Sequence, residues 1–204
     1  LARETRLQLN GRPDPFALLE QLCAHSARAF HFGWQWDADM AFISITPERL
    51  FRRQGQHIES EAIAGTRPRG RDVLEDEQLA QDLFRDTKEV REHLLVLRYL
   101  EERFGSHCTH VEQLSRLESL KLTHVQHLQS RLRGVLREGV SDAELLAALH
   151  PTPAVCGLPQ EKARAHIRRL EGFDRGWYAG PIGCVSPQYS EFAVEYVVRC
   201  ERKR

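Results

Sequence analysis

The stretch His31-Phe-Gly-Trp-Gln-Trp-Asp-Ala-Asp-Met-Ala-Phe-Ile-Ser-Ile45 decides the fold class of this 204-residue sequence. On both sides of the polar turn Asp37-Ala-Asp39, large apolar residues alternate with smaller or polar ones. A period of two is typical of β-strands, and a short polar turn between two such runs predicts a hairpin. A second hairpin is predicted from 48–52 and 57–63, around Gln54-Gly-Gln56. We therefore expect the sequence up to about Gly65 to form antiparallel sheet.

Helical spacing takes over after Asp72, where leucine and valine recur at three- and four-residue steps as far as Phe104. Gly105 is the expected end of that helix. A short helix is also predicted after Asp14, with Asp14 as N-cap and Pro15 in the first helical position. Further helices are expected over 122–137, 142–149 and 160–170, and strands over 1–9 and 172–198.

These elements predict one α+β domain over residues 1–204, in which antiparallel sheet layers pack with helices. The 29 basic residues balance the 29 acidic ones, so a nucleic-acid partner and an anionic membrane surface are not indicated. No apolar run is long enough to cross a bilayer. The 5 cysteines are irregularly spaced, which indicates reduced thiols and a cytoplasmic protein. The oligomeric state is left open.

Glu48 is the first candidate for chemistry. It lies in Thr46-Pro-Glu-Arg-Leu50, directly after an apolar strand and beside a proline-fixed backbone. A carboxyl held in a defined direction suits a general acid, if burial raises its pKa toward neutrality. The alternative is an exposed turn at Glu48-Arg49.

Two further segments have compositions that suit an anionic ligand and a metal ion. In Ile63-Ala-Gly-Thr-Arg-Pro-Arg-Gly70, Gly65 allows a ligand close to the backbone and Thr66 adds a hydroxyl. On the long helix, Glu89 and Glu92 are three residues apart and share a face. Paired carboxylates of this kind can bind Mg²⁺. The alternative is that they belong to the solvent-exposed face of the helix.

Proline, glycine and aromatic residues are dense in 150–159 and 171–183, which predicts fixed irregular loops of the kind that line sites. His127 falls in a predicted helix, where a lone histidine is more often a core residue than a catalyst. From the residues alone, the sequence indicates an enzyme-like α+β domain with a possible Mg²⁺-carboxylate site.

Taken together and in this order, four segments resemble the chorismate-binding enzymes. The match runs across essentially the whole chain, and within the family it points to the isochorismate synthases of menaquinone and catechol-siderophore pathways. Ala64 stands where aminodeoxychorismate synthases carry a lysine. The four segments are Ser44-Ile-Thr-Pro-Glu-Arg-Leu50, Ala62-Ile-Ala-Gly-Thr-Arg-Pro-Arg-Gly70, Lys88-Glu-Val-Arg-Glu-His93 and His150-Pro-Thr-Pro-Ala-Val-Cys-Gly-Leu-Pro159.

The resemblance implies a Mg²⁺-dependent reaction in which water adds at C2 of chorismate while the C4 hydroxyl leaves. Glu48 would be the general acid for that hydroxyl, and His127 would lie near it. Gly65 would donate its N–H to a carboxylate of chorismate, with Thr66 beside it. Glu92 would bind Mg²⁺, with Glu89 behind it.

The chain also departs from the family pattern. The family's base is a lysine in a strand whose end matches Leu1-Ala-Arg3, so the lysine would precede the first residue. A second Mg²⁺ glutamate and a carboxylate-binding arginine would follow the last strand. Cys156 and Cys184 replace a usual glycine and a usual large residue. The resemblance therefore implies an incomplete chorismate-binding domain, lacking N-terminal strands and a C-terminal segment.

Two alternatives to isochorismate formation stay open. One is a non-catalytic fragment that binds chorismate weakly or folds poorly. The other is an enzyme of the same family with a different product, anthranilate or salicylate.

Overall fold

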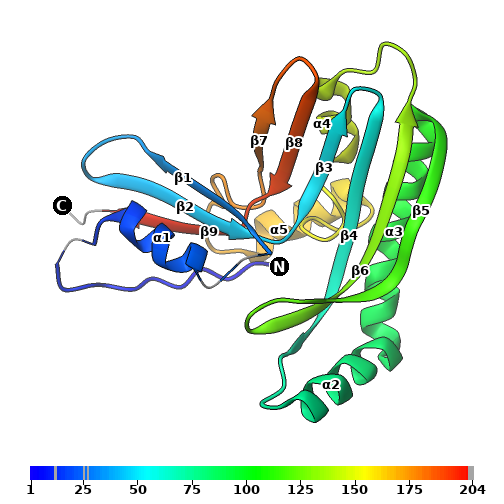
Figure 1. Cartoon of the computed structure of the whole chain (residues 1–204). Coiled ribbons are helices and arrows are strands. Elements are labelled where there is room, and N and C mark those ends of the chain that lie inside the picture. Colours follow the sequence, from blue (N-terminus) through cyan, green and yellow to red (C-terminus); the bar gives the residue numbers. More distant parts are fainter. Residues whose placement is uncertain (12, 25, 27, 202–204) are drawn as a thin grey trace.

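The computed structural model describes residues 1–11, 13–24, 26 and 28–201, which form two antiparallel sheets and five helices (Figure 1). The fold is α+β, as the sequence predicts. In chain order the elements are α1 (Pro15–Ala24), β1 (Phe30–Gln35), β2 (Met40–Thr46), β3 (Arg49–Gln54), β4 (His57–Pro68), α2 (Val73–Arg85), α3 (Thr87–His107), β5 (Cys108–Lys121), β6 (Val125–Leu136), α4 (Asp142–Leu149), α5 (Gln160–Leu170), β7 (Pro181–Val185), β8 (Tyr189–Val194) and β9 (Val197–Glu201).

The smaller sheet has three strands in the order β1-β2-β9, and the larger has six in the order β5-β6-β4-β3-β8-β7. All neighbouring strands are antiparallel. The long helix α3 lies along one face of the larger sheet (Figure 1). Between them is the main core, with large apolar side chains that are almost fully buried: Phe51, Ile58, Leu97, Leu100, Phe104, Leu132 and Leu136.

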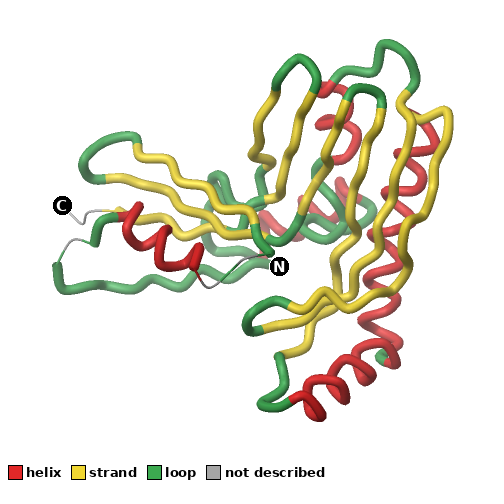
Figure 2. Tube along the Cα trace, in the orientation of Figure 1, coloured by secondary structure: helices red, strands yellow, loops and turns green. Residues whose placement is uncertain are grey.

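The chain passes between the two sheets at two neighbouring places. Only Pro47 and Glu48 separate β2 from β3, and only Glu195 and Tyr196 separate β8 from β9. Since β2 pairs with β9 and β3 pairs with β8, the two connections run side by side (Figure 2). The Val194 amide donates to the Glu48 carbonyl at 2.9 Å, which fixes the two connections to each other.

Both predicted hairpins are confirmed, as β1-β2 and β3-β4. The helix start at Asp14 is confirmed as well, because its Oδ1 accepts from the amides of Phe16 at 2.8 Å and Ala17 at 3.2 Å. The helices predicted over 142–149 and 160–170 match α4 and α5. In the described part of the chain, no helix has both the length and the apolar character needed to cross a membrane.

Five predictions were wrong. Residues 1–9 contain no strand, and the strand pattern predicted from Gly172 begins only at Pro181. The helix predicted from Asp72 to Phe104 is two helices, because Asp86 is extended and its carboxylate caps α3 by accepting from the amides of Lys88 and Glu89. Gly105 does not end α3, which continues to His107. Residues 122–137 form the strand β6 and not a helix.

The strand β6 escapes detection because three of its inward positions carry small or polar side chains. Gln126 is buried and donates to the carbonyls of Pro68 and Asp76. Ser130 is buried against the ring of His93, with Oγ 2.8 Å from Nε2. At Gly134, an added Cβ would lie 2.5 Å from Cys108 Sγ. The remaining leucine and valine positions then imitate helical spacing.

Candidate active site

Glu48 lies at the connection between the two sheets and is only 4% exposed. Two hydroxyls hold its carboxyl, one on each oxygen. Thr152 Oγ1 donates to Oε1 at 3.2 Å, and the Tyr196 phenol donates to Oε2 at 2.8 Å. The Glu48 amide donates to Thr46 Oγ1 at 3.1 Å, which fixes the backbone on the other side. The exposed turn considered for Glu48-Arg49 is therefore wrong.

Burial raises the pKa of Glu48 from 4.5 to about 7, while the hydrogen bonds from Tyr196 and Thr152 act in the opposite direction. No cation accompanies the carboxyl among the partners that the structure describes. A carboxyl with a pKa near neutrality can hold a proton at physiological pH and release it during a reaction, which is the property required of a general acid.

Gly65, Thr66 and His127 form a second cluster. Gly65 has φ +80°, and an added Cβ would lie 3.3 Å from both Glu89 Cβ and Leu128 Cδ1, so a side chain would be strained and crowded here. His127 Nδ1 lies 3.0 Å from Thr66 Oγ1 and 3.3 Å from the Gly65 carbonyl. Burial lowers the pKa of His127. The hydrogen bond to the Gly65 carbonyl acts in the opposite direction but is the smaller effect, so the ring is neutral at physiological pH.

The helical placement expected for His127 is wrong, because the residue lies on β6 directly opposite Thr66 of β4. Strand pairing, and not helix geometry, brings the histidine to the predicted ligand-binding segment.

Glu89 joins this cluster from the start of α3. Its Oε2 accepts from the Thr66 amide at 3.3 Å. Lys88 Nζ lies 3.2 Å from Glu89 Oε1 and 3.3 Å from Glu92 Oε1, so the two carboxylates share a face as the sequence predicts. The Glu92 side chain is 53% exposed, against 16% for Glu89. Within the described residues, no group of three or more His, Cys, Asp or Glu is arranged to hold a metal ion.

The structure thus brings Gly65, Thr66, His127 and Glu89 together, with Glu92 one helical step away. Glu48 stands apart from them. In the described part of the chain its side-chain hydrogen bonds go to Thr152 and Tyr196, and none goes to the Gly65 cluster.

Sequence reasoning missed two residues of the Glu48 site, Thr152 and Tyr196, and a buried carboxyl next to Tyr196 in the chain, Glu195. Thr152 lies in the proline-rich loop that the sequence marks, but nothing there distinguishes it from its neighbours. Tyr196 gives no local signal, because its approach to Glu48 depends on strand pairing across the chain. Glu195 is 2% exposed, its Oε1 has no partner in the described structure, and burial raises its pKa to about 7.

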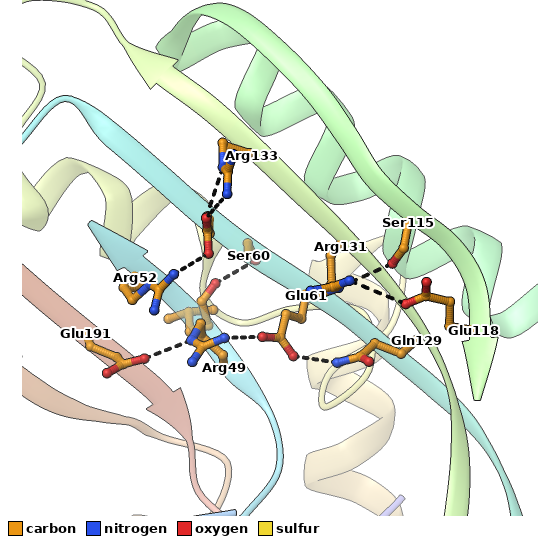
Figure 3. A network of polar contacts seen from close by, with 12 residues as sticks. Arg49, Arg52, Ser60, Glu61, Ser115, Glu118, Gln129, Arg131, Arg133 and Glu191 are labelled. Atoms are coloured by element: carbon orange, nitrogen blue, oxygen red, sulfur yellow. Dashed lines mark hydrogen bonds and ion pairs between the residues drawn. The ribbon is translucent and has the colours of Figure 1, made fainter. Parts of the chain in front are cut away.

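Arg49, the next residue after Glu48, has very different surroundings (Figure 3). Its guanidinium pairs with Glu61, and its Nε donates to Glu191 Oε1 at 2.8 Å. Alternate residues of β4 belong to the main core, so these charges lie on the sheet face away from that core. The network is continued by ion pairs of Glu59 with Arg52 and Arg133 and by a contact of Arg131 with Glu118.

Comparison with known proteins agrees with this fold. Residues 1–200 match the family model described as chorismate binding enzyme. The solved structure of MenF, the menaquinone-specific isochorismate synthase from Escherichia coli, superposes with a TM-score of 0.81 at 35% identity, covering 90% of this chain and 44% of that one. The chain belongs to the family of chorismate-binding enzymes.

Within that family, its relatives include isochorismate synthases. Isochorismate synthase 2 from Arabidopsis thaliana is 41% identical over 194 residues, which are 95% of this chain and 34% of the plant protein. Isochorismate synthase DhbC from Bacillus subtilis is 33% identical over 200 residues, covering 92% of this chain and 50% of the relative. The chain thus spans between a third and a half of the length of these relatives.

Proposed function

We propose that this chain carries the proton-donating part of an isochorismate synthase. In the proposed reaction water adds at C2 of chorismate and loses a proton to a base, which is a lysine in the family pattern, while Glu48 gives its proton to the departing C4 hydroxyl, which leaves as water. The observation that carries the proposal is the buried Glu48 carboxyl, held by two hydroxyls and protonated near neutrality. Membership of the chorismate-binding family supports the substrate.

The second cluster is proposed to bind the substrate. The backbone at Gly65 has no side chain to keep a ligand away, and Thr66 presents a hydroxyl that already contacts a neutral His127. Hydrogen-bond donors of this kind suit a carboxylate of chorismate. His127 would lie near the hydroxyl that leaves.

For Mg²⁺ we propose Glu92 as ligand, with Glu89 behind it. Mg²⁺ is usually held by one or two carboxylates together with water and substrate oxygens, so this donor set fits the ion. The half-exposed Glu92 carboxylate pairs only with Lys88 among the described residues, which leaves oxygen donors accessible. When bound, Mg²⁺ would neutralise the ring carboxylate of chorismate.

The proposal also covers the class of substrate, the partners, the localisation and the pathway. The substrate is a small molecule, and the balanced charge gives no support for a nucleic-acid or membrane partner. Cytoplasmic localisation, and a place in menaquinone or siderophore biosynthesis, remain part of the proposal.

The direct test is to incubate the chain with chorismate and Mg²⁺ and to separate the products by chromatography. If the chain turns chorismate over, the proposal requires isochorismate as the product, and Glu48→Gln should reduce its rate of formation by about 10²–10⁴-fold, because the proton donor is lost. Glu118→Gln is the matched control, since Glu118 is half exposed and, among the described residues, makes only a 3.7 Å ion pair with Arg131. Anthranilate or salicylate as the main product would contradict the proposal.

A second candidate function is binding of chorismate without turnover. The lysines that the structure describes are Lys88, Lys121 and Lys162, and none of them is buried as a lysine base would be. Calorimetric titration with chorismate distinguishes the two candidates. Saturable heat with no consumption of chorismate would support binding alone, and consumption would exclude it.

A further inference from the structure

Glu48 lies in the connection between β2 and β3. Tyr196 lies in the connection between β8 and β9, which is the only other connection between the two sheets in the described chain. Its carbonyl accepts from Ser44 Oγ at 2.8 Å, which fixes the backbone against β2. Its ring packs edge-on against Tyr178, with centroids 5.9 Å apart. These two contacts direct the phenol to Glu48 Oε2, at 2.8 Å.

We propose that Tyr196 is a positioning residue for Glu48: its phenol fixes the orientation of the carboxyl and stabilises the negative charge that remains when Glu48 gives up its proton. The inference rests on the proposed function, in which Glu48 is the general acid. It adds a residue that comes from a segment 148 positions away in the sequence.

The argument for this role is electrostatic. When Glu48 transfers its proton to a leaving hydroxyl, it becomes a carboxylate in a site from which water is excluded. A buried carboxylate is strongly unfavourable unless hydrogen bonds compensate it. A phenol at 2.8 Å provides a charge-assisted hydrogen bond, which is about twice as strong as a neutral one.

The two hydroxyls on Glu48 are not equivalent. The Thr152 hydroxyl is 3.2 Å from Oε1, whereas the phenol is at 2.8 Å from Oε2 and has the larger effect on the pKa of Glu48. Without these two donors, burial would raise that pKa further above 7. Tyr196 therefore keeps the acid in the range where it can release its proton.

In a titration, the signal of Glu48 must be distinguished from those of the other ionisable groups near this site. Tyr178 lies beside Tyr196; burial raises its pKa, Arg175 lowers it, and the charges of Glu171 and Glu48 raise it. Glu195, next to Tyr196 in the chain, is the second buried carboxyl with a pKa of about 7. Burial and the neighbouring Glu48 both raise the pKa of Tyr196, so its phenol stays protonated while Glu48 titrates.

The test is a carbon NMR titration of the chain labelled at the glutamate side-chain carboxyl, in the absence of chorismate. Glu48→Gln and Glu195→Gln assign the signals of the two buried glutamates whose pKa is about 7. Tyr196→Phe should raise the pKa of Glu48 by about one pH unit, because it removes a hydrogen bond to the charged form. Tyr178→Phe is the matched control: it removes a neighbouring phenol that makes no hydrogen bond to Glu48 in the described structure, and it should leave the value in place.

An unchanged or lowered pKa of Glu48 in Tyr196→Phe would overturn the inference. If that variant does not fold, the unsubstituted chain labelled at the tyrosine Cζ provides the test. The Tyr196 signal should then shift with the same midpoint as Glu48, about 7, and a signal that does not follow Glu48 would overturn the inference as well. Because neither titration needs turnover, failure of the proposed isochorismate reaction is detected separately.

Discussion

Glu48 and Arg49 are neighbours in the chain, yet the surroundings of Glu48 favour its neutral form and those of Arg49 favour its charged form. Glu48 is enclosed at the connection between the sheets with two hydroxyl partners, and burial raises its pKa to about 7. Arg49 is also partly buried, which lowers its pKa, but Glu61 and Glu191 outweigh burial and raise it. The comparison shows that the partners of a buried group, and not burial alone, decide whether it keeps its charge.

Glu59 extends the comparison to a carboxyl that pairs with Arg52 and Arg133 of the same network. Burial alone would raise its pKa, as it does for Glu48, but Arg133 and Arg52 lower it below the ordinary value. The network therefore has the properties of a structural surface with fixed charges. The site at Glu48 has the properties of a place where a proton can be exchanged.

The largest effect on stability is expected from removing the buried carboxyls. Between pH 4.5 and about 7 the unfolded chain releases the protons of Glu48 and Glu195 while the folded chain retains them. The free energy of unfolding therefore falls as the pH rises through this range. Glu48→Gln and Glu195→Gln should each raise it at pH 8 by on the order of 2–3 kcal/mol.

Urea unfolding at pH 4 and pH 8 measures this effect, and the gain should vanish at pH 4 because both carboxyls are then protonated in both states. An equal gain at the two pH values would mean that packing, and not ionisation, distinguishes the variants.

A smaller effect is expected when the network loses its central cation. Arg49→Met leaves the carboxylates of Glu61 and Glu191 without the guanidinium between them, so the free energy of unfolding at neutral pH should fall by about 1–2 kcal/mol. The double variant Arg49→Met/Glu61→Gln should recover part of this loss, because it also removes one of the unpaired charges. Additive losses in the double variant would show that the pair is not coupled.

The smallest effect is expected at the edge of the network. Arg133 is 47% exposed, and Glu59 keeps Arg52 as a partner when Arg133 is lost. Arg133→Met should therefore lower the free energy of unfolding by less than about 1 kcal/mol. Thermal melts at low salt and in about 1 M salt provide the check, since the difference should disappear when the charges are screened. A difference that persists in high salt would point to lost packing of the arginine stem.

The sequence allowed the two hairpins to be predicted because their apolar residues alternate without interruption. It did not allow β6 to be predicted, because Gln126, Ser130 and Gly134 fill its inward positions for reasons that only the packed structure shows. The break at Asp86 was missed for a related reason. The Asp86 side chain caps α3, but the leucine spacing of α2 and α3 continues across this residue, so the sequence shows no break.

Of the candidate site, the residues within recognisable segments could be predicted. Glu48, Gly65, Thr66, Glu89 and Glu92 were proposed in this way, and their roles remain predictions. The partners of Glu48 could not be found, since Thr152 and Tyr196 reach it only after strands far apart in the sequence have paired. Local patterns carry no information about that pairing.

The position of Glu48 between the sheets also has a mechanical consequence. The two sheets diverge from the adjacent connections at Glu48 and Tyr196 (Figure 1). When the angle between two bodies changes, points at the vertex move least and points at the far ends move most. Thermal opening and closing of the sheets should therefore displace the turns near Asp37 and Gly55 while the carboxyl and its phenol keep their separation. The acid is therefore placed where a change in the angle between the sheets should displace it least.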